Sequence, residues 1–103
     1  MPVVVIAVFY PSSGRTPDLI DALRKTMPAI HQECECELYA IHEAENGTIT
    51  MVEKWGSREA LAAHAAGPAV KVLQEAVSGL VARPATVTTM TPLPAGSAEQ
   101  GEI

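Results

Sequence analysis

The segment CELYAIHEAENGTITMVEKW, Cys36–Trp55, decides the fold, because Asn46-Gly47 lies between two runs of alternating apolar and polar residues. A tight two-residue turn with the twist of paired strands needs positive φ at both central positions, and Asn and Gly tolerate this conformation. The segment therefore predicts a β-hairpin with Asn46 and Gly47 as its turn.

A two-residue turn also fixes which residues face each other across the hairpin. One side of the predicted sheet then carries the pairs Ala44–Ile49, His42–Met51, Ala40–Glu53 and Leu38–Trp55. The other side is more polar and carries the pairs Glu43–Thr50, Ile41–Val52 and Tyr39–Lys54. We therefore expect Glu53 and Trp55 on the apolar, inward side of the sheet.

The run Val3 to Tyr10 is rich in β-branched and aromatic residues and ends at PSSG, which predicts a strand. Both of its faces are apolar. An antiparallel sheet with helices on one side normally leaves its other face polar, so this strand needs a cover on each face. A chain this short has few helices to spare, and we expect a second subunit to supply the second cover.

A first helix is predicted from Thr16, Pro17 and Asp18, which suit a cap, the first helical position and the positive end of the helix dipole. The helical spacing of the following apolar residues supports it: Leu19, Ile20, Leu23, Met27 and Ile30. Pro28 is expected to bend or divide this helix.

A second helical region is predicted after Ser57, which can cap REALAAHAA. Gly67-Pro68 interrupts the pattern before AVKVLQEAVSGLVA resumes it, and an extended segment restarts at Pro84. The last residues are rich in proline, glycine and polar residues, so we expect residues 92–103 to form a loose tail or a dimer arm.

The predicted order is strand, helix, strand, strand, helix, strand, which is typical of an α+β ferredoxin-like βαββαβ sandwich with a four-stranded antiparallel sheet. At 103 residues the chain fits one domain, which we assign to residues 1–91. In this topology the first and third strands are central, which places Glu53 and Trp55 in the middle of the sheet.

Composition argues against several functions. The net charge of −5 offers no basic stripe for nucleic acid. The short apolar run at the start resembles neither a signal peptide nor a membrane span, so we expect a cytoplasmic protein. Cys34 and Cys36 are the only cysteines, and without further soft ligands they read as free thiols rather than as a disulfide or a metal site.

The candidate site residues lie in VEKWGSREALAAHAAGP, Val52 to Pro68. Glu53 on an apolar face is costly to bury without a partner, Trp55 offers a flat surface for an aromatic ligand, and His64 lies at the margin of the helix's apolar stripe. Leu38, His42 and Met51 share the predicted face and are candidate substrate-binding residues. The chain has no metal-ligand spacing, serine nucleophile elbow or glycine-rich phosphate motif.

Each of these residues also has a structural interpretation that the sequence leaves open. Glu53 could be an ion-paired strand carboxylate, Trp55 a core residue, and His64 a buried histidine whose hydrogen bonds are satisfied. Their chemistry, if present, would be acid–base work without a cofactor.

The chain resembles the antibiotic biosynthesis monooxygenase superfamily over roughly residues 3–91. The resemblance rests on VVVIAVF at the start, VEKW at the end of the third strand, SREALAAH in the second helix and GPAV after the histidine. It implies a homodimer, a dimeric α/β barrel in which two sheets pack together, with a pocket between sheet and helices in each subunit.

The same resemblance implies oxidation of a quinol, polyphenol or aromatic polyketide by O2 with no metal or flavin. His64 would then be the base or anion-binding donor. Glu53 would orient or protonate the substrate, and Trp55 would form a wall of the pocket. Haem-degrading relatives use an asparagine and an iron-ligating histidine where this chain has Ala7 and Leu73, so haem degradation is disfavoured. A ligand-binding or stress-related role without chemistry, and a proton-shuffling isomerase, remain open alternatives.

Overall fold

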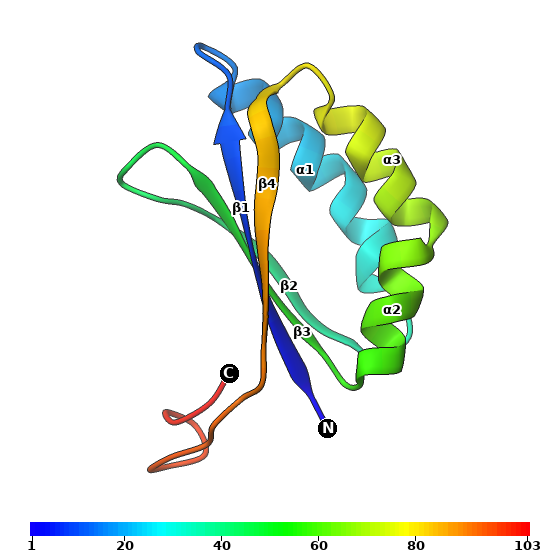
Figure 1. Cartoon of the computed structure of the whole chain (residues 1–103), viewed down its shortest axis with the longest axis vertical. Helices are drawn as coiled ribbons and strands as arrows, with labels where there is room; N and C mark the ends of the chain where they lie inside the picture. The colour runs from blue at the N-terminus through cyan, green and yellow to red at the C-terminus, as the bar shows by residue number, and fades with distance from the viewer.

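A computed structural model describes all 103 residues and contains one four-stranded antiparallel sheet with helices on one face (Figure 1). The elements follow in the order β1 (Val3–Pro11), α1 (Thr16–His31), β2 (Cys36–Glu43), β3 (Ile49–Trp55), α2 (Arg58–Ala66), α3 (Pro68–Val77) and β4 (Val81–Met90). The strand order is β2-β3-β1-β4, so β1 and β3 are central. The predicted ferredoxin-like βαββαβ fold is confirmed.

The hairpin is present, but the predicted turn is wrong by one residue. Ala44 and Thr48 close a three-residue loop, in which the Gly47 N–H donates to the Ala44 carbonyl at 3.0 Å and Gly47 has φ 89°. The Asn46 side chain accepts from the Thr48 backbone N–H at 3.0 Å and stabilises this loop. Asn-Gly therefore forms a turn with a glycine bulge instead of a two-residue turn.

The longer loop shifts the register and exchanges the two faces of β2. Tyr39 pairs with Glu53, Leu38 with Lys54, and His42 with Thr50. Because partners across an antiparallel ladder share a face, Tyr39 lies on the same side as Glu53, while Leu38 and His42 lie on the opposite side. The predicted positions of Leu38 and His42 beside Glu53 are therefore corrected.

Helix α1 begins one residue earlier than predicted. Arg15 is the cap residue and makes no side-chain cap bond, and Thr16 is already helical. The Arg15 side chain instead pairs with Asp18 at 3.2 Å. Pro28 lies inside α1 without dividing it, because a proline in the last turns removes only one backbone hydrogen bond.

Two short helices replace a single longer one between β3 and β4. The Ser57 hydroxyl accepts from the Ala60 backbone N–H at 3.1 Å and caps α2, as predicted. Gly67 has an extended conformation, and Pro68 then starts α3. The predicted interruption at Gly67-Pro68 is therefore confirmed.

Strand β4 begins at Val81, three residues before the predicted restart at Pro84. Proline is tolerated there because β4 is an edge strand and its register against β1 shifts between the Tyr10–Arg83 and Val8–Thr86 pairs. After β4 the chain forms no helix or strand, and the Ile103 carbonyl accepts from Lys54 Nζ at 2.5 Å. The tail thus ends beside the sheet face that carries no helix (Figure 1).

The core lies between the sheet and the helices. Its fully buried large side chains are Trp55, Leu19, Leu23, Ile30, Ile49, Met51 and Val3. None of the three helices is long and apolar enough to cross a membrane.

Candidate active site

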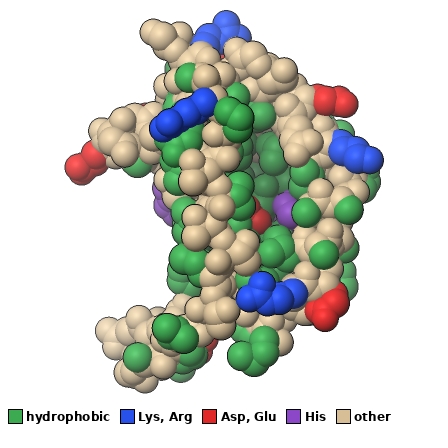
Figure 2. All heavy atoms as spheres, in the orientation of Figure 1, with side chains coloured by type: hydrophobic (Ala, Val, Ile, Leu, Met, Phe, Trp, Pro, Cys, Tyr) green, Lys and Arg blue, Asp and Glu red, His purple; other side chains and the backbone are tan.

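A cavity of about 650 Å³ lies between the helix-facing side of β1 and β4 and the helices α2 and α3. Figure 2 shows it as a hollow with hydrophobic side chains around it and acidic and histidine side chains at its floor. The polar side chains on its wall are Tyr39, Glu53, His64, Gln74, Ser78 and Thr89. An apolar hollow with a few polar groups is the usual form of a small-molecule site.

Glu53 lies at the centre of the sheet, on the helix-facing side of β3, and is only 6% exposed. Its Oε1 accepts a hydrogen bond from Trp55 Nε1 at 3.0 Å. Burial raises the pKa of the Glu53 carboxyl, the Glu33 charge adds to the rise, and the Trp55 bond and His64 oppose it. The carboxyl is therefore nearer to its protonated form than an exposed glutamate would be.

His64 lies in the last turns of α2 and is 7% exposed. Its ring stacks on Trp55 with 4.4 Å between centroids, and its Nδ1 lies 2.5 Å from Glu33 Oε1. On the other side of the ring, Nε2 lies 4.0 Å from Glu53 Oε1. The imidazole is thus held by Glu33 and Trp55, with Nε2 turned toward the cavity and the second carboxylate.

Tyr39 is the first site residue that the sequence interpretation missed, because the register error placed it on the outer face. Its ring meets His64 edge-on at 5.6 Å and Trp55 at 6.4 Å. Burial, and then the charges of Glu53 and Glu33, raise the pKa of the Tyr39 phenol well above its ordinary value. Tyr39 therefore stays a neutral hydroxyl, able to donate a hydrogen bond into the cavity.

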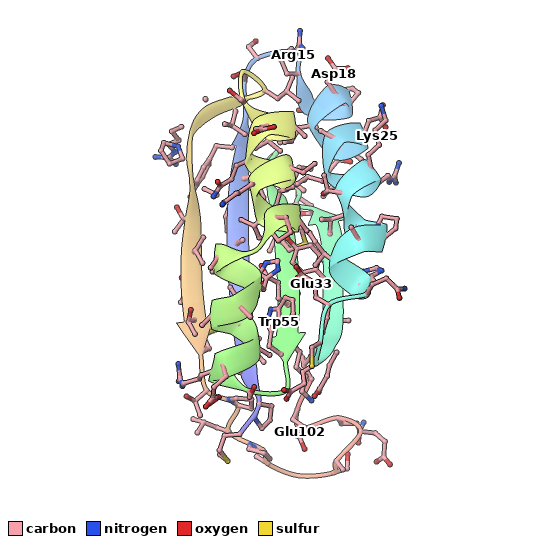
Figure 3. All side chains as sticks on the ribbon, turned by 90° about the vertical axis from the view of Figure 1, so that its right-hand side faces the viewer. Arg15, Asp18, Lys25, Glu33, Trp55 and Glu102 are labelled. Atoms are coloured by element: carbon pink, nitrogen blue, oxygen red, sulfur yellow. The ribbon has the colours of Figure 1, made fainter.

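Glu33 is the second missed residue. It lies in the turn after α1, and Figure 3 shows it between α1 and the junction of α2 and α3, with Trp55 behind α2. Nothing in the run of alternating Glu and Cys at residues 33–37 distinguishes it from Glu35 or Glu37. Only the packing of α1 against the second helical region brings it to His64.

The predicted site residues fall into three groups. Glu53 and His64 line the cavity together. Trp55 and Met51 lie on the predicted face but are fully buried beneath the cavity wall, so they support the site from below. Leu38 and His42 lie on the other face of the sheet, where His42 Nδ1 contacts the Thr50 carbonyl at 3.3 Å.

No group of three or more His, Cys, Asp or Glu side chains is arranged to hold a metal ion.

The family model for antibiotic biosynthesis monooxygenase matches residues 2–76. The chain belongs to this family. Membership in the antibiotic biosynthesis monooxygenase family supports a monooxygenase-like function.

The relatives cover nearly the whole chain. A protein of Mycobacterium tuberculosis named "Putative monooxygenase Rv0793" is 35% identical in an alignment 102 residues long, which covers 94% of this chain and 97% of that protein. Its solved structure superposes with a TM-score of 0.85 at 31% identity, covering 94% of this chain and all of that one. The structure of protein SO0527 from Shewanella oneidensis superposes with a TM-score of 0.78 at 27% identity, and the match covers 86% of this chain and 88% of that one.

Proposed function

We propose that this protein is a cofactor-independent monooxygenase that oxidises a small aromatic quinol or polyphenol with O2. The observation that carries the proposal is the pairing of a buried histidine and a buried carboxyl at the floor of an apolar cavity. Such a pair can take a proton from a phenolic hydroxyl while the apolar wall holds the aromatic ring.

The 4.0 Å gap between His64 Nε2 and Glu53 Oε1 is too long for a direct hydrogen bond. It is wide enough for one substrate oxygen to lie about 2.8 Å from both atoms. In that position a phenolic hydroxyl donates its proton to Nε2, and the raised pKa of Glu53 favours a protonated carboxyl that donates to the resulting oxyanion.

Tyr39, which pairs with Glu53 across the hairpin, adds a second neutral donor on the cavity wall. Because its pKa is raised, it does not compete with the substrate for ionisation. Two neutral donors aimed at the oxyanion would stabilise a phenolate without a metal ion.

The steps that follow deprotonation take place between the substrate and O2. Ground-state O2 is a triplet and reacts slowly with a neutral phenol, whereas a phenolate can transfer one electron to it. Recombination of the radical pair forms a carbon–oxygen bond, and loss of water gives a hydroxyquinone. One oxygen atom enters the ring, the other leaves as water, and the substrate supplies all four electrons.

Oxygen uptake with a panel of hydroquinones and catechols tests this proposal. His64→Ala should lower kcat by about 10²- to 10⁴-fold. The matched control is His42→Ala, which removes an exposed histidine from the other face and should leave uptake unchanged.

Equal oxygen uptake by wild type and His64→Ala would remove His64 from the mechanism. Binding of the quinols by wild type without any oxygen uptake would instead favour a ligand-binding role. Proton exchange in a ketone or lactone without oxygen uptake would favour an isomerase.

We also propose that a second copy of the chain covers the open face of the sheet. Apolar side chains occupy the centre of this face, on which no helix lies (Figure 1): Val4, Ile6, Val8, Leu38, Ala40 and Val52. In sedimentation, wild type should be a dimer and Ile6→Lys a monomer. Val72→Lys, which replaces an exposed valine on α3, should remain dimeric.

A reducing compartment fits the two free thiols, Cys34 and Cys36, and we propose the cytoplasm as the location. Cell fractionation with an antibody against the native protein would test it, and recovery outside the cytoplasm would contradict it.

A further inference from the structure

Glu33 lies between two hollows of the molecule. Its Oε1 contacts His64 at the floor of the substrate cavity, and its side chain also lines a second groove of about 430 Å³. The groove lies between α1 and α3, and its other lining residues are Lys25, Thr26, Ala29, Pro68, Ala69 and Val72. No strand residue lines it, and most of these side chains are exposed, so the groove opens on the outer side of the helix layer.

The backbone around Glu33 fixes the position of its carboxylate. The Glu33 N–H donates to the Ile30 carbonyl at 3.0 Å, and the Glu33 carbonyl accepts from the Cys36 N–H at 3.2 Å. Opposite it, a Cβ at Gly67 would lie 3.0 Å from the Ala63 carbonyl oxygen and 3.5 Å from Glu33 Oε2. A residue without a side chain at the α2–α3 junction therefore lets the two helices close around the carboxylate.

The direction of the hydrogen bond between His64 Nδ1 and Glu33 Oε1 determines which ring nitrogen of His64 carries the proton. An ionised carboxylate only accepts hydrogen bonds, so Nδ1 must carry a proton when it contacts Glu33. In the neutral ring, this leaves Nε2 with a free lone pair, and Nε2 is the atom that faces the cavity and Glu53.

We propose that Glu33 is a positioning residue that holds His64 in the Nδ1–H tautomer and connects its imidazole to water in the outer groove. This proposal rests on the proposed function in one respect only, namely that the free lone pair of Nε2 accepts a proton from the substrate. When Nε2 takes a proton, the imidazolium keeps its Nδ1–H bond to Glu33, whose negative charge stabilises it. When Nε2 returns that proton to the oxygen atom that leaves as water, the neutral Nδ1–H tautomer is restored. The histidine therefore neither gains nor loses a proton over one turnover.

The charged and titratable groups around this pair come from β2, β3 and α1. Glu53 of β3 and Tyr39 of β2 face the imidazole, and Cys36 at the start of β2 lies close enough to sense the Glu33 charge. Lys25 of α1 lines the outer groove with Glu33. Only Glu33 contacts Nδ1.

The tautomer can be measured without any substrate, by ¹⁵N NMR of the histidine ring nitrogens. Wild type should show His64 with a protonated Nδ1 and an unprotonated Nε2, and Glu33→Ala should show a mixture of tautomers. Glu37→Ala is the matched control: it removes an acid from the same run, but one that faces Lys54 at 3.7 Å, and should leave the His64 signals unchanged. His31 and His42 serve as internal references in each spectrum.

A small carboxylate can replace the missing side chain only if the outer groove reaches His64. Formate added to Glu33→Ala should restore the Nδ1–H tautomer and recover turnover that had fallen by about 10- to 100-fold. Glu33→Gln keeps the volume of the side chain without its charge, so it should lose turnover to a similar extent and gain nothing from formate.

The outcomes separate this inference from the function itself. An unchanged His64 tautomer in Glu33→Ala, or wild-type turnover in both variants, would overturn the positioning role. A tautomer mixture that formate does not reverse would overturn the connection to the groove. If wild type oxidises no quinol while the NMR results hold, the proposed function fails and the role of Glu33 stands.

Discussion

The two halves of the helix-facing layer are built from similar apolar residues, yet one is solid and the other is hollow. Under α1, the side chains of Leu19, Leu23 and Ile30 are fully buried. Under α2 and α3, the corresponding space over β1 and β4 is the cavity, with Glu53 and His64 at its floor. In this fold, one helix supplies the stability and the second helical region supplies the site.

The difference comes from chain continuity. Helix α1 is a single element of 16 residues, whereas Gly67-Pro68 divides the second region into helices of 9 and 10 residues. A divided helix cannot present one continuous apolar stripe to the sheet, so part of the sheet beneath it stays uncovered by close packing. Substitutions in the packed half and in the hollow half should therefore differ in their effects on stability and binding.

The largest effect is expected from a core truncation under α1. Leu23→Ala should lower the free energy of unfolding by about 2–5 kcal/mol, because it opens a new cavity in a packed region. Leu73→Ala should cost about 2 kcal/mol or less, because Leu73 already borders a hollow. Urea denaturation of both variants measures the contrast, and equal losses would contradict the division.

A smaller effect is expected from Trp55→Phe. This change removes the Nε1–H that donates to Glu53 and leaves a buried carboxyl without that partner, at a cost of about 1–3 kcal/mol at neutral pH. Tyr39→Phe is the control, since it removes a hydroxyl from the cavity wall and leaves the Trp55 hydrogen bond to Glu53 in place. Thermal unfolding measures both, and a Trp55→Phe variant as stable as wild type would show that the bond contributes nothing.

The pH dependence of Glu53 gives a prediction of defined sign. Its folded-state pKa lies above the ordinary 4.5, so the stability linked to its neutral form is present below that value and is lost as the pH rises through the folded-state pKa. Glu53→Gln, which resembles the neutral acid, should match wild type near about pH 4 and be more stable near about pH 8. A variant less stable than wild type at the higher pH would show that the ionised carboxylate is stabilised in the fold.

The smallest effect on stability is expected from filling the hollow half. Ala65 lines the cavity, and Ala65→Leu should change the free energy of unfolding by less than about 1 kcal/mol, because the added atoms enter open space. Binding of an aromatic ligand should weaken at least about tenfold. Ala62→Leu, on the same helix but outside the cavity, should leave binding unchanged, and calorimetry distinguishes the two variants.

Most of the fold was predictable because its signals are local. The doubly apolar β1, the Ser57 cap and the Gly67-Pro68 break each depend on a few neighbouring residues. The hairpin register was not predictable from Asn-Gly alone, because this dipeptide also fits a three-residue loop with Gly47 at positive φ. That one-residue difference removed Tyr39 from the predicted site and added Leu38 and His42.

The site itself was half predictable. Glu53 and His64 stand out as polar residues at apolar positions, which is a pattern that the sequence shows directly. Glu33 does not stand out, because its role depends on how α1 packs against the α2–α3 junction. Tertiary packing of this kind leaves no local pattern in the sequence.

A crystal structure of the protein with a hydroquinone bound in the absence of O2 tests the central claim most directly. We expect one ligand oxygen within hydrogen-bond distance of both His64 Nε2 and Glu53 Oε1, with the ring against the apolar wall formed by Leu73 and Val77. A hydroquinone bound elsewhere, with the floor of the cavity unchanged, would contradict the account.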